Sequence, residues 1–187
     1  MSVDLLINQI KKYLEQNGKL FICISGLSGA GKTYHAKILS QRLGLTHIDQ
    51  DQFYNNPSLL PRFTFSNGAR SKNWDCKEAL DLKKMNETID KHISTGIIFS
   101  GFACRDQWFD HDIDFQIHLS VTEDTCYIRR QEQGKDGYMG KMIVNELVYP
   151  FYIETIKNSH ISFTIDANEK SDLTMNKIIE WLTKNLN

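Results

Sequence analysis

The chain has 187 residues, of which 41% are hydrophobic and 24% charged, and its formal net charge at pH 7 is −1. This length predicts about one domain, with enough apolar residues to bury a core without disulfides or a structural metal. The near-zero charge argues against non-specific binding to nucleic acid or anionic membrane. We find no apolar run long enough to span a bilayer and no charged signal-peptide head, so we expect a cytoplasmic protein without a nucleic-acid or membrane partner.

Apolar periodicity predicts a series of helices and short strands. In chain order, we expect a helix over 3–17, a strand over 20–24, a helix over 32–43, a strand over 46–49 and a long irregular segment over 50–72. We then expect a helix over about 75–94, strands over 97–100 and 115–119, and a helix starting near 120–123. A glycine-rich stretch over 134–140, a helical segment kinked or broken at Pro150, a strand over 161–165 and a helix over about 172–186 complete the chain.

Five strands that alternate with helices predict an α/β fold with a mostly parallel sheet. In such a fold, ligands bind at the carboxyl ends of the strands. The helix over 75–94 is expected to begin at Asp75, because Glu78 three residues later completes a capping-box pattern. The cysteines have no metal-ligand spacing, so we expect reduced thiols at Cys23, Cys76, Cys104 and Cys126.

Residues 26–33 match the phosphate-binding pattern G-x-x-x-x-G-K-[ST] at every fixed position. The pattern lies between a predicted strand and a predicted helix, as a phosphate-binding loop (P-loop) requires. Glycines turn backbone N–H groups toward phosphate oxygens, the lysine supplies a positive charge, and the hydroxyl of the last residue is a ligand for Mg²⁺. We therefore expect ATP, or GTP, with Mg²⁺, bound by Gly26, Ser28, Gly29, Ala30, Gly31, Lys32 and Thr33.

Two further features follow predicted strands or precede a predicted helix. Asp51 comes just after the second strand, where a carboxylate could accept the proton of an attacking hydroxyl or help to hold Mg²⁺. Trp74 and Asp75 supply an aromatic plane beside a carboxylate, which suits a base and the hydroxyls of a ribose. The alternatives are loop solubility or a helix cap for Asp51, and a core tryptophan beside a helix cap for the pair.

Basic residues flank the glycine-rich stretch. Arg129, Arg130 and Lys135 there have the composition of a lid that closes over phosphates and excludes water. A solvated helix face is the alternative for the two arginines. We expect a single kinase domain over 1–187, with a lid over about 130–142 and an acceptor-binding insertion over about 52–75.

The chain resembles the nicotinamide riboside kinases, which belong with the uridine kinases among P-loop nucleoside kinases. The resemblance lies in residues 26–33, 48–54, 74–75, 100–102, 129–130 and 148–152, which occur in the family's order and approximate spacing. It implies a three-layer fold with a five-stranded parallel sheet, and transfer of the γ-phosphoryl group of ATP to a nucleoside 5′-hydroxyl. By position, it implies that Lys32 and Thr33 serve the triphosphate and Mg²⁺, that Asp51 is the catalytic carboxylate, that Trp74 stacks on the base, that Asp75 binds ribose hydroxyls and that Arg130 belongs to the lid. We further expect catalytic roles for Lys32 and Arg130, metal binding by Asp51, nucleotide contact by Arg129, and acceptor contacts from Asp51, Phe53, Lys135 and Tyr138.

The chain departs from this family at several places. Ser100 stands where the family has an acidic residue, which removes a charge that would help to organise Mg²⁺. Asp106 in the following loop is one possible replacement. Gln133 and Lys135 stand about where the family has an arginine and an aromatic residue, and Tyr138 could replace the aromatic one. The acidic run over 110–114 resembles a metal site but is interpreted as a solvated loop.

Two other functions remain open. The chain could phosphorylate another small hydroxylated metabolite, or it could be a catalytically weak nucleotide-binding regulatory protein. A GTPase or ATPase switch is disfavoured because the chain has no N-K-x-D pattern for guanine. We expect the protein to be a monomer or a homodimer. Its substrate is expected to be a small, nucleoside-like molecule.

Overall fold

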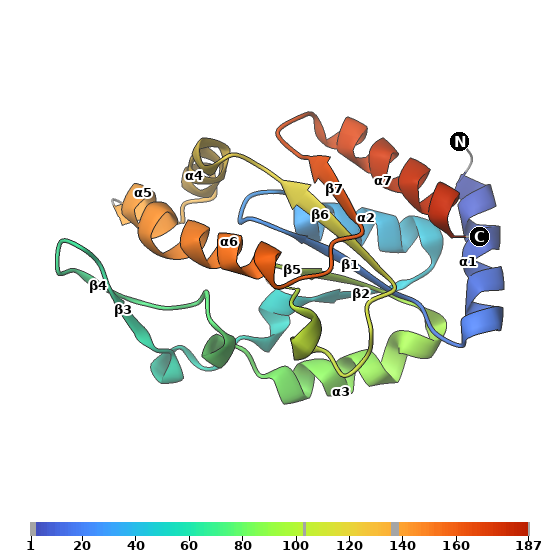
Figure 1. Ribbon diagram of the computed structural model, residues 1–187, viewed down its shortest axis with the longest axis horizontal. Coiled ribbons are helices and arrows are strands. Elements are labelled where there is room, and N and C mark those ends of the chain that lie inside the picture. Colours follow the sequence, from blue (N-terminus) through green and yellow to red (C-terminus); the bar gives the residue numbers. More distant parts are fainter. Residues whose placement is uncertain (1–2, 103, 136–138, 187) are drawn as a thin grey trace.

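The structure is a computed structural model that describes residues 3–102, 104–135 and 139–186 (Figure 1). At its centre is a five-stranded sheet in the order β2-β5-β1-β6-β7, in which every neighbouring pair is parallel. These strands are β1 Phe21–Gly26, β2 Thr46–Asp49, β5 Ile97–Gly101, β6 Phe115–Ser120 and β7 Phe163–Asp166. The sheet confirms the predicted α/β P-loop fold, and all five predicted strands are present within a few residues of their expected bounds.

Helices cover both faces of the sheet and complete three layers (Figure 1). One face packs against α1, α2 and α7, and the other packs against α3. The helices are α1 Val3–Asn17, α2 Lys32–Leu43, α3 Leu82–His92, α4 Glu123–Glu132, α5 Gly140–Ile143, α6 Tyr149–Lys157 and α7 Ser171–Asn185. None of these described helices combines the length and the apolarity that crossing a membrane requires.

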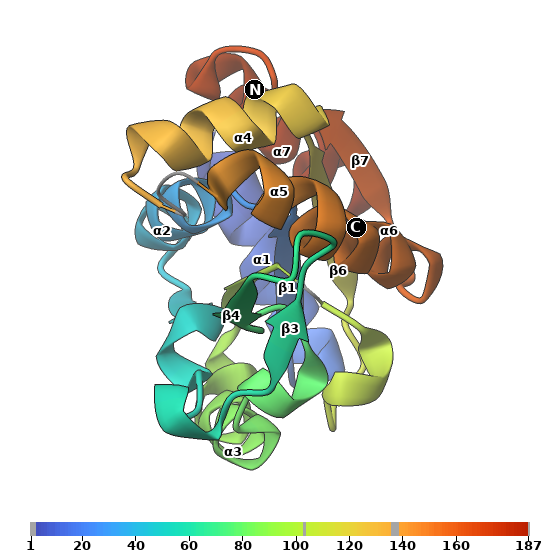
Figure 2. The same cartoon turned by 90° about the vertical axis from the view of Figure 1, so that its left-hand side faces the viewer.

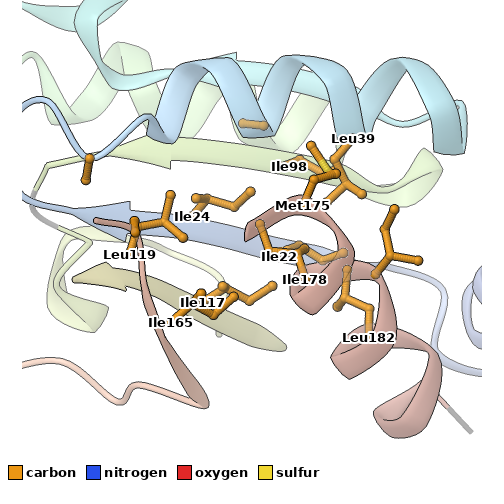
Figure 3. Packing of buried hydrophobic residues seen from close by; sticks show 14 of the residues in the cluster. Ile22, Ile24, Leu39, Ile98, Ile117, Leu119, Ile165, Met175, Ile178 and Leu182 are labelled. Carbon is orange, nitrogen blue, oxygen red and sulfur yellow. The ribbon is translucent and has the colours of Figure 1, made fainter. Parts of the chain in front are cut away.

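The central strand β1 shows why this sequence forms a sandwich. Successive side chains of a strand point to opposite faces, and Ile22 and Ile24 belong to the core under α2 and α7, whereas Phe21 and Cys23 belong to the core above α3. Figure 3 shows the first of these cores, where both isoleucines of β1 meet side chains of α2, α7 and the neighbouring strands. Each fully buried side chain of this kind stabilises the fold by about 1.5–3 kcal/mol.

The helix expected from Asp75 begins later than predicted. Residues Lys77–Ala79 form a short 3₁₀ turn, and α3 starts at Leu82 after Asp81, whose carboxylate accepts a hydrogen bond from the backbone N–H of Lys84 at 3.0 Å. Asp81 rather than Asp75 therefore supplies the cap. Asp75 is left outside the helix, in the segment that faces the site.

The segment over 50–72 is less irregular than predicted. It contains 3₁₀ turns at Gln50–Phe53 and Pro57–Leu59 and an antiparallel hairpin of β3 Arg62–Thr64 and β4 Arg70–Lys72. Gly68 at the tip has a φ of 81°, which favours glycine. Strands of three residues are too short for alternation to reveal them, so the sequence pattern gave no sign of this hairpin.

The helical segment around Pro150 is continuous rather than broken. Between α5 and α6 the backbone passes through one π-helical turn, Val144–Val148, and Pro150 lies in the first turn of α6. Because proline has no N–H, Pro150 cannot donate a hydrogen bond to the helical turn that precedes it, and this turn is the π-helical one. The π-helical turn before the proline is a feature that often accompanies functional sites.

Two of the four cysteines differ from the expectation of reduced thiols. Cys23 on β1 and Cys104 in the loop after β5 are bonded as a disulfide, whereas neither Cys76 nor Cys126 forms a disulfide with another described residue. The pairing follows from the sheet order, because β1 and β5 are neighbours although the two cysteines are 81 positions apart. Sequence spacing cannot show such a proximity.

Candidate active site

A cavity of about 960 Å³ opens at the carboxyl ends of β1, β2 and β5. Its walls come from the P-loop, the turn after β2, the hairpin β3–β4, the end of α4 and the segment that begins with α5. Figure 2 looks onto this region and shows the hairpin across from α5. The lining residues include Ser28, Gly29, Gly31, Lys32, Thr33, Asp49, Asp51, Tyr54, Arg70, Ser71, Lys72, Trp74, Asp75, Gly101, Phe102, Arg130, Gln133, Lys135 and Met139.

The P-loop connects β1 to α2 and leaves the start of the helix open. Gly31 occupies the N-cap of α2 with a φ of 87°, and no side chain caps the first N–H groups. Unpaired N–H groups and the helix dipole attract an anion to this position. Gly29 also has a positive φ, 79°, and a Cβ there would lie 3.0 Å from the Cβ of Arg129. The loop therefore has the backbone of a phosphate site.

Lys32 lies half-buried at the base of the cavity. Its Nζ donates a hydrogen bond to the carbonyl of Leu27 at 3.2 Å and lies 5.9 Å from the centre of the Phe102 ring. Burial lowers the pKa of Lys32 to about 8, although the negative charge of Asp51 acts in the opposite direction. The ammonium group is thus short of compensating charge, and a phosphate would supply it.

Two carboxylates face Lys32 from the end of β2. The side chain of Asp49 accepts a hydrogen bond from the backbone N–H of Asp51 at 3.2 Å, which begins the 3₁₀ turn after the strand. Partial burial and the charge of Asp49 raise the pKa of Asp51, while Lys32 and Lys135 oppose the rise. A carboxylate with a raised pKa is a better proton acceptor. Asp49 was not predicted as a site residue, although it ends the same strand.

An aromatic wall lies beyond these carboxylates. The rings of Tyr54 and Trp74 meet edge to face, with centroids 5.2 Å apart and planes at 88°. Trp74 is 38% exposed, which is a high fraction for a tryptophan and leaves part of its ring open to the cavity. The backbone N–H of Asp75 donates to the side chain of Asn73 at 2.9 Å. Burial, and after it the negative charge of Asp75, raises the pKa of Tyr54. Ring and carboxylate thus lie side by side in the cavity wall.

The two consecutive arginines of α4 have different surroundings. Arg130 lines the cavity, as Lys135 does. Arg129 instead donates from Nη1 to the carbonyl of Gly29 and from Nη2 to the carbonyl of Ala167, each at 3.0 Å. Its guanidinium holds the P-loop backbone in place and does not line the cavity.

Several other predicted site residues also lie away from the cavity. Gly26 and Ala30 do not line it, and a Cβ at Gly26 would overlap the carbonyl oxygen of Leu119, so packing against β6 requires this glycine. Phe53 is 3% exposed and packs in the core on the α3 side. Tyr138 lies outside the described residues.

Ser100, which replaces an acidic residue of the nucleoside-kinase pattern, and Asp106, its possible replacement, both lie outside the cavity. Ser100 is fully buried, and its hydroxyl lies 3.0 Å from Nε2 of His47, so it does not face the cavity. Asp106 is exposed at the start of a 3₁₀ turn and does not line the cavity either. The additional carboxylate in the cavity is Asp49.

The acidic run over 110–114 forms structural hydrogen bonds. His111 pairs with Asp90 at 2.6 Å, and Asp114 accepts the backbone N–H of Phe21 at 2.7 Å. Within the described part of the chain, no group of three or more His, Cys, Asp and Glu side chains has the arrangement of a metal site.

The described residues do offer single oxygen ligands for a divalent cation. Thr33, Asp49 and Asp51 line one region of the cavity and offer only oxygen atoms, the ligands that Mg²⁺ prefers. Mg²⁺ commonly takes one or two protein carboxylates together with phosphate oxygens and water. This set of side chains fits Mg²⁺ bound together with a triphosphate.

The hairpin lies within the segment that was expected to be an acceptor-binding insertion, but its own residues were not predicted to belong to the site. Arg70, Ser71 and Lys72 of β4 line the cavity. The tip is fastened to the opposite wall, because the backbone N–H and the hydroxyl of Ser66 donate to the carboxylate of Glu146 at 2.8 and 2.6 Å. Glu146 belongs to the π-helical turn after α5. The wide turn thus carries the residue that joins the two walls.

Comparisons with known proteins agree with this fold. The model of a family described as AAA domain (AAA_18) matches residues 22–147. A search of curated proteins finds no match. Solved structures with a similar fold include deoxyadenosine kinase from M. mycoides with bound dATP, which is 18% identical with a TM-score of 0.58 over 87% of this chain and 98% of that chain.

Two further structures extend the comparison to other acceptors. Shikimate kinase from Acinetobacter baumannii, in complex with shikimate, is 17% identical with a TM-score of 0.56 over 92% of this chain and 98% of that chain. A sugar kinase from Janibacter sp. HTCC2649 is 16% identical with a TM-score of 0.56 over 88% of this chain and 94% of that chain. At these identities the likeness establishes the fold alone.

Proposed function

We propose that this chain, which belongs to the AAA domain family (AAA_18), transfers the γ-phosphoryl group of ATP to a hydroxyl of a small molecule, and that the acceptor is a ribonucleoside phosphorylated at its 5′-hydroxyl. One observation carries the proposal. A single cavity joins the P-loop and Asp51 to the aromatic ring of Trp74 and the carboxylate of Asp75. The first pair suits a triphosphate and an attacking hydroxyl, and the second pair suits a base and a ribose.

Different residues of the cavity would bind the phosphates, neutralise charge and hold the metal ion. Gly29, Gly31 and Lys32 would hold the phosphates, and Arg130 and Lys135 would neutralise charge on the transferring group. Thr33, Asp49 and Asp51 would be the candidate protein ligands or neighbours of Mg²⁺, which would offset the negative charge of the phosphates. Positioning and charge stabilisation supply most of the rate enhancement in such reactions.

Asp51 is the candidate proton acceptor. As the new bond forms between the acceptor oxygen and the γ-phosphorus, the bond to the ADP oxygen breaks and the hydroxyl proton passes to the Asp51 carboxylate. The raised pKa of Asp51 favours this transfer. The neighbouring Asp49 contributes to the raised pKa and thereby supports the same step.

The alternatives concern the acceptor and the activity. Structures of similar fold include kinases whose titles name a sugar or shikimate, so a non-nucleoside hydroxylated acceptor is the second candidate. A catalytically weak nucleotide-binding protein is the third. The proposed enzyme is a cytoplasmic monomer or homodimer whose substrates are small molecules, with neither nucleic acid nor membrane as a partner.

A coupled assay of ADP release tests the proposal. We expect turnover with ATP, Mg²⁺ and at least one ribonucleoside from a panel of nicotinamide riboside, uridine, cytidine and adenosine. Trp74→Ala should raise the KM of that nucleoside and leave the KM of ATP unchanged, because the ring lies on the acceptor side. Turnover of sugars or hydroxy acids alone would overturn the nucleoside assignment. ATP binding without turnover of any acceptor would favour the regulatory alternative.

A further inference from the structure

The hairpin brings two positive charges to the acceptor side of the cavity. Arg70 and Lys72 of β4 both line it, and Trp74 and Asp75 follow them along the same wall. The wall from residue 70 to residue 75 therefore presents cations, then an aromatic plane, then a carboxylate. The last two suit a base and a ribose, and the first two call for an anion.

Neither cation is neutralised within the described residues. The Nε of Arg70 donates to the hydroxyl of Thr64 at 3.3 Å, which holds the side chain along the hairpin, and its two terminal nitrogens have no hydrogen bond or ion pair to another described residue. Lys72 likewise forms no ion pair with another described residue. An unpaired guanidinium suits a carboxylate or phosphate, which it can bind through two parallel hydrogen bonds.

The phosphate end of the cavity has cations of its own. The charges that act on the pKa of Lys32 come from Asp51, Lys135, Asp49 and Cys126, and Arg130 is the cation that acts on the pKa of Tyr54. Arg70 and Lys72 are not among these electrostatic neighbours. The described lining has five cations (Lys32, Arg70, Lys72, Arg130, Lys135) against three carboxylates (Asp49, Asp51, Asp75). The hairpin pair supplies the surplus at the end away from the P-loop lysine.

The hairpin is also held in a defined place. Both hydrogen bonds from Ser66 to Glu146 tie its tip to the wall that begins with α5, as Figure 2 shows for the facing elements. A pair of charges on a fastened hairpin is better ordered than the same pair on a free loop, so less entropy is lost when a ligand binds.

We infer that the acceptor carries a carboxylate, which Arg70 and Lys72 bind. The inference rests on the proposed function for the rest of the acceptor: a ribonucleoside whose base stacks on Trp74 and carries the carboxylate toward the hairpin. The hairpin pair then selects the acceptor, while Lys32, Arg130 and Lys135 serve the phosphates.

Matched acceptor pairs test the inference. The kcat/KM values of the wild-type protein are compared for orotidine against uridine, and for nicotinic acid riboside against nicotinamide riboside, with gluconate against glucose as a pair without a base. Hydrogen bonds to charged groups predict a preference of about 10- to 100-fold for the carboxylated member of at least one pair. Equal or greater activity with the neutral nucleosides would overturn the inference and leave the proposed function intact.

Variants locate the effect. Arg70→Gln and Lys72→Gln should each raise the KM of the carboxylated acceptor by about tenfold or more, with little change for its neutral partner or for ATP. Arg62→Gln is the matched control, because Arg62 is exposed on the paired strand opposite Lys72 and does not line the cavity. A rise in the KM of ATP instead would show that the hairpin cations contact the phosphates, which would overturn the inference.

Binding measurements separate this inference from the proposed function. Calorimetric titration of the same acceptor pairs, with a non-hydrolysable ATP analogue present, does not depend on turnover. Tighter binding of the carboxylated member, lost in Arg70→Gln, would support the carboxylate subsite even if phosphoryl transfer were absent. If gluconate binds more tightly than glucose while neither carboxylated nucleoside binds more tightly than its neutral partner, the carboxylate subsite is retained and the nucleoside assignment is rejected. No preference within any pair would reject the subsite.

Discussion

Replacement of Lys32 by methionine should stabilise the nucleotide-free protein while it destroys the nucleotide site. Burial lowers the pKa of Lys32 from its ordinary 10.5 to about 8. At about 1.4 kcal/mol for each tenfold change in proton affinity, this lowering corresponds to a penalty of about 3 kcal/mol for the charged form at neutral pH. Methionine keeps the aliphatic length and removes the charge, but it leaves the carbonyl of Leu27 without its donor. We therefore expect a net gain of about 1–3 kcal/mol in the free energy of unfolding at pH 7.

The sign and the pH window of this effect follow from the two pKa values. The penalty is fully present below pH 8, where Lys32 is charged in the folded and the unfolded protein. It is relieved as the pH rises from about 8 to 10.5, because the folded protein releases the proton first. Urea unfolding of both proteins at pH 7 and pH 10 should thus show a difference that shrinks at the higher pH.

The stability of Lys32→Met is to be compared with that of a control variant that replaces an exposed lysine. Lys37→Met changes an exposed lysine of the same helix and should shift stability by less than about 0.5 kcal/mol. Lys32→Met should also abolish the rise in melting temperature that Mg·ATP gives to the wild-type protein. If Lys32→Met were less stable than the wild type at pH 7, or if its advantage persisted unchanged at pH 10, the argument from the buried charge would be refuted.

Three further predictions follow from the site and the fold. Asp51→Asn should lower turnover by about 10²- to 10⁴-fold in the ADP-release assay, and a loss below about tenfold would exclude proton transfer to this residue. Asp81→Ala should lower the free energy of unfolding by about 1 kcal/mol in urea titration because α3 loses its cap, and unchanged stability would contradict that role. Glu146→Ala should raise the KM of the acceptor and leave that of ATP unchanged, because the hairpin loses its fastening to Ser66. A changed KM for ATP alone would place the effect at the wrong end of the cavity.

The parts of the fold that the sequence predicts well are those that local pattern determines. Buried parallel strands are continuous apolar runs, so β1 and β5 were found within two residues of their ends, and α2 was found with both ends correct because glycines flank it. The P-loop motif likewise indicates its own position in the fold, because the motif occurs between a strand and a helix. In these places one stretch of chain carries the whole signal.

The parts that the sequence does not predict depend on a choice between similar local signals. Asp75 and Asp81 both resemble helix caps, and only the structure shows that the 3₁₀ turn Lys77–Ala79 separates them. Had Asp75 capped the helix, its carboxylate would have faced the first backbone N–H groups of the helix. The late start of α3 is therefore what leaves Asp75 in the cavity wall beside Trp74.

Arg129 and Arg130 show the same limit in the active site. Successive residues of a helix point about 100° apart, so neighbouring arginines can have different surroundings, and composition does not say which of them lines the cavity. The structure turns Arg130 to the cavity and Arg129 to the carbonyl groups of Gly29 and Ala167. The hydrogen bond from Arg129 to the carbonyl of Gly29 makes α4 part of the support of the P-loop. Because the same helix carries Arg130 to the cavity wall, the hydrogen bond from Arg129 to Gly29 links the backbone of the P-loop to the position of Arg130.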